Sequence, residues 1–183
     1  MGFAIAEELA NQGFEVFLIS GPVQLATPKN VQRFDVLTAD EMYDLTVEKF
    51  KSCDAAIMCA AVADYKPSHQ AENKIKRTTD SMTIELVPNK DIAKRLGEIK
   101  TSKQRLVGFA LETENEKNNA LNKIRKKNLD FIVLNSLNDK GAGFKHDTNK
   151  ICIINSNGEI TNYELKQKRE VAKDIIKKLV QIL

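Results

Sequence analysis

The stretch that decides the fold is Ala55–Lys76, A-A-I-M-C-A-A-V-A-D-Y-K-P-S-H-Q-A-E-N-K-I-K. It opens with an apolar run, Ala55–Ala61, that carries no charge. Such a run predicts a strand buried on both faces, which is typical of a parallel sheet covered by helices on either side. Small residues and then Asp64 follow it. Because ligands of open α/β sheets bind outside the carboxyl ends of strands, we expect a binding site at this edge.

Positive charge follows the strand, at Lys74, Lys76 and Arg77. A strand end with one carboxylate and a basic loop after it suits a charged ligand such as a nucleotide. The same pattern also fits an aspartate that caps a turn beside a solvated surface loop. The polar residues 72–81 could form a movable flap over the site or a plain surface loop. The pattern alone decides neither between a ligand site and a capped turn nor between a flap and a loop.

Composition limits the class of protein. The 183 residues, 42% of them apolar and 29% charged, predict one domain over residues 1–183 with a substantial core. A net charge of +3 is too small to indicate nucleic acid. Cys53, Cys59 and Cys152 have no paired or zinc-like spacing, which favours a reducing, cytoplasmic setting. No apolar run approaches the ~20 residues of a membrane span, so no membrane partner is expected.

The order of predicted elements is that of an α/β protein. Expected helices cover residues 1–11, 39–51, 90–99, 114–128 and 166–183, and Thr38 with Glu41 is expected to form a capping box at the start of the second. Expected strands cover residues 15–20, 31–37, 55–61, 82–87, 105–111 and 129–135, and a hairpin covers 150–163 about Asn157-Gly158. We therefore predict a Rossmann-like three-layer sandwich, with a mostly parallel sheet and a C-terminal antiparallel hairpin.

The chain opens directly with a helix. In such folds a strand and a glycine-rich turn usually feed the first helix and form a phosphate site with its N-terminus. Here only Met1-Gly2 precedes it. The pattern therefore lacks the expected first strand and glycine-rich loop, as an N-terminally truncated domain would.

Three further features are candidates for ligand contacts. Asn89 is a predicted N-cap whose helix start could hold a phosphate or merely be capped. Phe109, near the end of a predicted strand, could stack on a base or pack in the core. Lys123 and Lys127 are four apart and project from one face of a predicted helix, where such a pair can grip a triphosphate or remain solvated.

Several of these motifs together resemble the phosphopantothenate–cysteine ligase family. The resemblance begins with A-A-V-A-D-Y at 60–65 and K-I-K-R at 74–77, and covers nearly the whole chain. The further matches, in order, are Asn89-Lys90-Asp91-Ile92, residues 107–113 (V-G-F-A-L-E-T), Lys123 through Lys127 before Asn128-Leu129-Asp130, and Gly143-Phe144 with Asp147 and Asn149. No single motif is decisive, but their common order is specific.

The resemblance implies a set of nucleotide-binding residues. Met58, Cys59 and Ala60 would offer backbone groups and Asp64 its side chain, and Lys74 would be the catalytic-loop lysine. The remainder of the pocket would be Lys90, Asp91, Ile92, Ala93, Phe109, Lys123 and Lys127. Lys90 stands where the family has proline, and Arg77 where it more often has lysine. No metal ligand set is implied.

The resemblance also implies a reaction. The carboxylate of 4′-phosphopantothenate would attack the α-phosphorus of CTP, giving an acyl-cytidylate and pyrophosphate, and the amine of L-cysteine would then displace CMP. Mg²⁺ is expected to share the triphosphate charge. The family is dimeric, with the hairpin region expected at the interface. In bacteria it is usually fused behind a flavin-dependent decarboxylase, so FMN is not expected in this chain. Family members also carry an N-terminal segment that contributes to the acyl-cytidylate site and has no counterpart in this sequence.

Two other functions remain open from the residues. One is a Rossmann-type oxidoreductase that binds NAD(P), although no G-x-G-x-x-G is present. The other is a non-catalytic fragment that binds a nucleotide without turnover.

Overall fold

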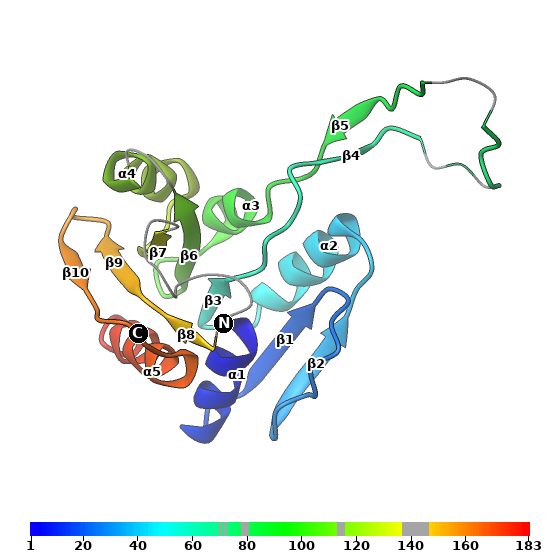
Figure 1. Cartoon of the computed structure of the whole chain (residues 1–183). Helices are drawn as coiled ribbons and strands as arrows, with labels where there is room; N and C mark the ends of the chain where they lie inside the picture. The colour runs from blue at the N-terminus through cyan, green and yellow to red at the C-terminus, as the bar shows by residue number, and fades with distance from the viewer. Residues whose placement is uncertain (70, 72, 78–80, 113–115, 137–146) are drawn as a thin grey trace.

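The structure is a computed structural model of the chain, and it describes residues 1–69, 71, 73–77, 81–112, 116–136 and 147–183. Its main sheet has five strands in the order β10-β9-β7-β6-β3 (Figure 1). These strands are β3 (Ala55–Met58), β6 (Arg105–Glu112), β7 (Phe131–Ser136), β9 (Ile151–Asn155) and β10 (Ile160–Asn162). β3, β6 and β7 run parallel, whereas β9 and β10 are antiparallel to their neighbours. The predicted α/β class, with its mostly parallel sheet and C-terminal hairpin, is confirmed.

A second, two-stranded sheet lies beside β3. Strands β1 (Val16–Ser20) and β2 (Val31–Asp35) pair in parallel along their whole length. Among the described residues, no strand pairing joins β1 to β3. The two sheets therefore face each other across an unpaired gap.

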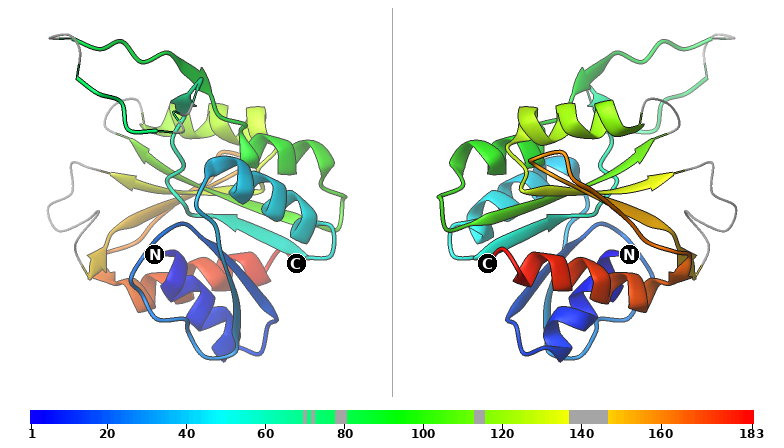
Figure 2. Two further views of the ribbon diagram at one scale, coloured as in Figure 1. Left: turned by 90° about the vertical axis from the view of Figure 1, so that its right-hand side faces the viewer. Right: turned by 90° about the vertical axis from the view of Figure 1, so that its left-hand side faces the viewer.

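Helices cover both faces of the sheets, as Figure 2 shows. On one face α1 (Gly2–Asn11) and α5 (Lys168–Val180) form a core cluster that includes Val107. On the other face α2 (Ala39–Phe50), α3 (Ile92–Ile99) and α4 (Glu116–Lys127) form a cluster that includes Leu106. Both residues are fully buried, because adjacent side chains of a strand point to opposite faces and each face here has a helix layer. This is the predicted three-layer arrangement.

An extended arm projects from this body. Strands β4 (Tyr65–Pro67) and β5 (Leu86–Pro88) form an antiparallel ribbon that leads away from α2 and α3 (Figure 1). At the base of the arm, the ammonium of Lys66 pairs with Asp40 on α2. The expectation of a strand over 82–87 was wrong in extent, since the paired residues are 86–88. Residues 78–80 of the predicted flap 72–81 lie outside the described part of the chain.

The C-terminal part of the chain ends in α5, which completes the helix layer that contains α1. The hairpin predicted at Asn157-Gly158 is confirmed, with Gly158 at φ 85°, a value that glycine adopts without strain. A short antiparallel pair, β8 (Thr148–Asn149) with β11 (Lys166–Gln167), then leads into α5, which packs against α1.

Two local expectations need correction. Residues 55–61 were expected to form a strand buried on both faces. Instead β3 ends at Met58, and all four of its residues are partly exposed, because no strand among the described residues pairs with its outer edge. Thr38 accepts a hydrogen bond from the Glu41 amide, as predicted for an N-cap. Glu41, however, accepts from the amide of Leu37 rather than from that of Thr38.

Candidate functional site

A cleft of about 500 Å³ lies beside the end of β3 and over β6, between the turn after β3 and helices α3 and α4. We call it the lysine cleft. Its charged lining residues are Asp64, Lys90, Asp91, Lys123 and Lys127, and its other lining residues include Met58, Ala60, Asn89, Ile92, Ala93, Gly108 and Phe109. Three lysines and two aspartates thus surround one space next to the carboxyl end of a parallel strand, where α/β proteins bind ligands.

The turn after β3 forms one wall, and Asn89 holds it in place. The backbone amide of Asn89 donates to the Asp64 carbonyl at 2.8 Å, and its side-chain nitrogen donates to the Ala63 carbonyl at 2.8 Å. Ala60 and Ala63 are small, so a ligand can approach the backbone closely there. The side-chain oxygen of Asn89, Oδ1, is buried, and no residue that the structure describes donates a hydrogen bond to it. A buried acceptor of this kind indicates a missing donor or cation.

Helix α3 begins at the cleft, and its cap is Asp91. The Asp91 carboxylate accepts from the amide of Lys94 at 3.0 Å and lies 3.0 Å from the Lys127 ammonium. The expectation that Asn89 caps this helix was therefore wrong. Burial alone would raise the pKa of Asp91, but the hydrogen bonds from Lys94 and Lys127 outweigh it and lower the pKa below its ordinary value. Asp91 is therefore a charged partner for Lys127 at neutral pH.

Close backbone contact fixes the end of α4 that carries Lys127. A β-carbon added to Gly97 of α3 would lie 1.9 Å from the carbonyl oxygen of Lys127, so only glycine permits this approach. The side chain of Asn128 donates to the Gly97 carbonyl at 2.9 Å, and Asn128 itself has φ 51°, which ends the helix. The position of Lys127 is thus set by backbone packing and not only by its flexible side chain.

The other two lysines approach the cleft from different elements. The Lys90 ammonium lies 3.6 Å from an oxygen of Asp44 and 4.7 Å from the ring centroid of Tyr43, both on α2. Lys123 is one turn before Lys127 on α4 and is half-buried at the cleft. Lysines from two separate segments therefore reach the cleft, and the two on α4 share one helix face, as their spacing predicted.

Most of the predicted nucleotide-binding residues line the lysine cleft; Cys59 and Lys74 do not. Cys59 lines a second cavity on the other side of the turn, beside Gly2, where burial raises the pKa of its thiol. Phe109 borders the cleft, but its ring packs with the α1–α5 cluster on the opposite face of the sheet. Core packing, the alternative considered for Phe109, is therefore what its side chain does.

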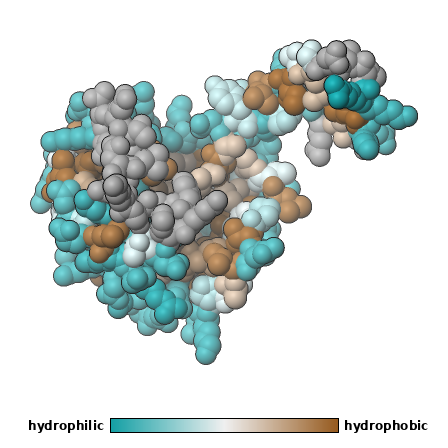
Figure 3. Space-filling view, in the orientation of Figure 1, coloured by the Kyte–Doolittle hydropathy of each residue, from teal (hydrophilic) through white to brown (hydrophobic). Residues whose placement is uncertain are grey.

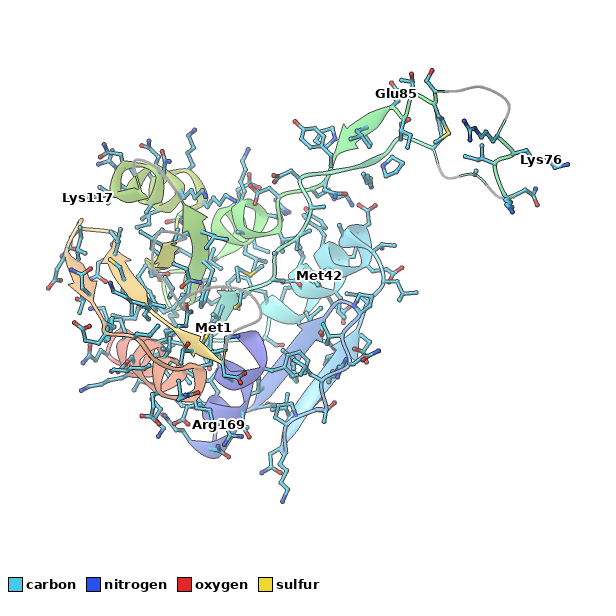
Figure 4. The ribbon with its side chains drawn as sticks, viewed as in Figure 1. Met1, Met42, Lys76, Glu85, Lys117 and Arg169 are labelled. Carbon is cyan, nitrogen blue, oxygen red and sulfur yellow. The ribbon has the colours of Figure 1, made fainter. Side chains whose placement is uncertain are left out.

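Lys74 lies in the arm, away from the cleft. Figure 4 shows the nearby Lys76 at the far end of the arm, well separated from Met42, which lines the cleft. The arm also exposes apolar side chains, seen as brown surface in Figure 3: Ile75, Met82, Ile84 and Leu86 are each more than half exposed. Within one chain the structure does not bring Lys74 to the other candidate residues.

Two features of the site could not be taken from the sequence pattern. One is the clamp from Asn89 to Ala63 and Asp64, because the residues are about 25 positions apart. The other is a shared wall: Met58, Ala60, Val62 and Ala63 line both the lysine cleft and the cavity that contains Cys59. A single segment of chain thus separates the two cavities.

No group of three or more metal-ligating side chains occurs within the described ranges. The oxygen donors at the cleft, the Asp64 carboxylate and the unpaired Asn89 Oδ1, suit a hard cation that is held mostly by a ligand's own phosphates. No helix in the part of the chain that the structure describes is long and apolar enough to cross a membrane.

Comparison with known proteins shows the family to which the chain belongs. The sequence model described as "DNA/pantothenate metabolism flavoprotein C-terminal domain" matches residues 1–183. A protein of an unknown prokaryotic organism named "Cysteine/Cysteine sulfinic acid decarboxylase" is 50% identical, covering all of this chain and 51% of its own. The "Coenzyme A biosynthesis bifunctional protein CoaBC" of Haemophilus influenzae is 42% identical, covering 99% of this chain and 45% of its own.

The solved structures agree. The crystal structure of the C-terminal domain of a coenzyme A biosynthesis bifunctional protein CoaBC superposes with a TM-score of 0.81 and 38% identity, covering 97% of this chain and 79% of that one. The chain spans about half the length of the curated relatives that it matches.

Proposed function

The chain belongs to the family of the DNA/pantothenate metabolism flavoprotein C-terminal domain, and on that premise we propose that it joins 4′-phosphopantothenate to cysteine at the expense of CTP. The observation that supports this proposal is the convergence of Lys90, Lys123 and Lys127 on one cleft. Relatives named as bifunctional coenzyme A biosynthesis proteins support the same pathway.

In the first step, an oxygen of the pantothenate carboxylate attacks the α-phosphorus of CTP. A new P–O bond forms, the bond to the β-phosphate oxygen breaks, and pyrophosphate leaves. In the second step, the cysteine nitrogen attacks the acyl carbon, CMP departs with the bonding electron pair, and the proton that the nitrogen loses passes to CMP or to solvent, leaving an amide. The protein's part in both steps is to position the reactants and stabilise charge on the phosphates.

The cleft residues suit these tasks. Lys123 and Lys127 can bind the triphosphate, and a phosphate that reaches Lys127 would replace its ion pair with Asp91 at 3.0 Å. Asp64, at the end of the turn that Asn89 clamps, can accept hydrogen bonds from the nucleoside. Bound Mg²⁺ would supply additional charge neutralisation at the phosphates, with Asp64 and Asn89 Oδ1 as the nearest protein oxygens.

Lys74 can take part only if the arm brings it to a cleft. We propose a homodimer in which the arm of one copy supplies Lys74 to the cleft of the other. The exposed apolar residues of the arm support such an interface, because a surface of this kind is usually covered by a partner. The hairpin β9–β10, whose outer strand is an edge of the main sheet, remains the other predicted interface.

Lys74→Gln tests the role of this lysine. We expect it to abolish CMP formation and leave the fold intact, since Lys74 is exposed on the arm. Lys177→Gln, at an exposed position of α5, is the control and should not change turnover. Mixing Lys74→Gln with Lys127→Gln chains should then restore part of the activity if the residues act across the dimer. Wild-type turnover by the Lys74 variant would remove this lysine from the mechanism.

The main experiment measures pyrophosphate release with CTP and phosphopantothenate, followed by CMP release on adding cysteine. It is run on this chain and on one extended at its N-terminus, because the family's additional segment contributes to the acyl-cytidylate site. CTP binding without pyrophosphate release in both would favour the non-catalytic nucleotide-binding fragment. Protection of the fold by NAD rather than by CTP would favour the oxidoreductase.

A decarboxylase is the second candidate, because the 50% identical relative carries that name. Release of CO₂ from cysteine or cysteine sulfinate by this chain alone would support it. For the ligase we expect no CO₂ and an amide product. We further propose a cytoplasmic setting, where the thiols of Cys53, Cys59 and Cys152, which form no disulfide, would remain reduced.

A further inference from the structure

The ammonium of Lys90 is held by two residues that lie outside the lysine cleft. Lys90 lines the cleft, whereas its partners on α2, Tyr43 and Asp44, do not. The ammonium nitrogen lies 4.7 Å from the centroid of the Tyr43 ring and 3.6 Å from an oxygen of Asp44. Tyr43 and Asp44 can therefore influence a ligand of the cleft through Lys90.

One face of α2 carries both partners of Lys90. Asp40, Tyr43 and Asp44 are three and four residues apart, so the helical repeat places them side by side. Asp40 pairs with Lys66 at the base of the arm. The hydrogen bond from Lys66 is the main cause that lowers the pKa of Asp40, and the charge of Lys90 lowers it further. Lys90 thus lies beside an acidic and aromatic face of α2.

The two partners hold the ammonium in different ways. The Tyr43 ring packs against the core cluster that includes Leu106, so its position is fixed. An ammonium over an aromatic face is attracted by the charge distribution of the ring, and its other N–H donors remain available to a phosphate. Tyr43 can therefore stay in contact with Lys90 when a ligand binds.

Asp44 is an anion, as a phosphate is, and competes for the same N–H donors of Lys90. Its side chain is 70% exposed, so water screens the ion pair and the pair contributes little to stability. A phosphate with more than one negative charge can replace this carboxylate as the partner of Lys90.

Lys90 also lies on the opposite side of α3 from the lysines of α4. Helix α3 packs against both α2 and α4 and lies between them (Figure 1). Lys127 reaches the cleft from the α4 side, where it pairs with Asp91, whereas Lys90 contacts α2. Amines on two sides of one cleft suit a ligand with several phosphate groups better than a monophosphate.

We propose that Tyr43 is a positioning residue that keeps Lys90 at the cleft for a polyphosphate, and that Asp44 is the anion that the polyphosphate displaces. Since the proposed ligand is the triphosphate of CTP, these roles rest on the proposed function. Removing the two side chains should have opposite effects. Without the Tyr43 ring, the Lys90 side chain moves into solvent and affinity falls. Without the Asp44 charge, a competitor is lost and affinity rises.

The test measures the binding of CTP, CMP and inorganic tripolyphosphate to the 183-residue chain by isothermal titration calorimetry. We expect Lys90→Met to weaken binding of CTP and tripolyphosphate by about tenfold or more, and binding of CMP by less than about twofold. Tyr43→Leu should weaken binding of CTP and tripolyphosphate by about two- to fivefold. Asp44→Asn should strengthen it by about two- to threefold.

Two control variants should bind all three ligands as the wild type does. Tyr43→Phe keeps the aromatic face over which the Lys90 ammonium lies. Lys126→Gln removes an exposed lysine of α4 that does not line the cleft. A loss of CTP affinity in Lys126→Gln equal to that in Lys90→Met would show a general effect of charge and overturn the role of Lys90.

Double variants separate positioning from a structural role of Tyr43. In the Lys90→Met background, neither Tyr43→Leu nor Asp44→Asn should change the affinity for CTP or tripolyphosphate, because both act through the missing ammonium. An effect of Tyr43→Leu that persists in that background would overturn the proposal. An equal loss of CTP and CMP affinity in Tyr43→Leu, or weaker CTP binding by Asp44→Asn, would also overturn it.

Tripolyphosphate distinguishes failure of these roles from failure of the ligase function. The expected pattern of tripolyphosphate affinities without pyrophosphate release from CTP would overturn the reaction and support the roles of Tyr43 and Asp44. Pyrophosphate release by the wild type, with unchanged polyphosphate affinity in Lys90→Met and Tyr43→Leu, would overturn these roles and leave the ligase function supported. Binding of neither CTP nor tripolyphosphate by the wild type would overturn both.

Discussion

The ammonium nitrogen of Lys127, at the end of α4, lies 3.0 Å from a carboxylate oxygen of Asp91, the cap of α3. One aspartate thus both starts a helix and holds a cleft lysine. The pair is partly exposed, so its own contribution to stability is small. The pair matters because it holds the Lys127 ammonium at the cleft, where a phosphate can replace Asp91 as its partner.

Lys127→Gln should weaken CTP binding. A hydrogen bond to a charged group contributes about 1.5–3 kcal/mol, which corresponds to a loss of affinity of roughly 10- to 100-fold. The matched control is Lys126→Gln, an exposed neighbour on α4 that does not line the cleft. Isothermal titration calorimetry measures both affinities, and an equal loss in both variants would contradict a specific role for Lys127.

Asp91→Asn should make the free energy of unfolding depend less on pH in the acidic range. Asparagine also caps helices, so the change removes the charge and retains the cap. Because the folded pKa of Asp91 is lowered from 3.8, its carboxylate stabilises the fold above that pH, and this contribution is lost as the pH falls through the folded value. Urea unfolding should show the wild type more stable at about pH 7 and the difference shrinking as the pH falls below 3.8.

Gly97→Ala should destabilise the protein. In a helix this change normally stabilises by up to about 1 kcal/mol, but here the new β-carbon meets the Lys127 carbonyl, and overpacking costs about 1–3 kcal/mol. Gly21→Ala is the control, since nothing lies within 4 Å of its added carbon. Chemical unfolding gives both values. CTP affinity should fall with Gly97→Ala as well, because α4 must move.

Asp40→Asn should loosen the base of the arm. Its hydrogen bond with Lys66 lowers the pKa of Asp40, so the carboxylate is charged at neutral pH and the ion pair is formed. We expect faster amide exchange in β4 and β5 and unchanged exchange in β6. Glu48→Gln, on the same helix but paired with its neighbour Lys49, should leave the arm unchanged. A uniform increase in exchange over the whole chain would indicate a general loss of stability instead.

Local spacing predicted the parts of the site that lie on one element. Lys123 and Lys127 both reach the cleft because the helical repeat puts residues four apart on one face. Asn89 and Asp91 are both good cap residues two positions apart, so spacing could not choose between them. The structure uses Asn89 to bind Ala63 and Asp64, a long-range contact that leaves Asp91 as the cap.

The local sequence pattern could not predict where longer segments lie or which sheet edges are paired. The basic loop with Lys74 was identified from its residues, but nothing in them indicates that the ribbon β4–β5 carries it away from the body. The apolar composition of Ala55–Met58 correctly indicated a strand with helix layers on both faces. That composition could not show which of its two edges would be paired, since pairing depends on chain that is distant in sequence.

Met58, Ala60, Val62 and Ala63 form a wall that the lysine cleft shares with the cavity containing Cys59. A ligand that orders this wall from one side would lower the entropic cost of binding a second ligand on the other side. By linkage the effect would be reciprocal: each ligand would raise the affinity for the other by the same factor.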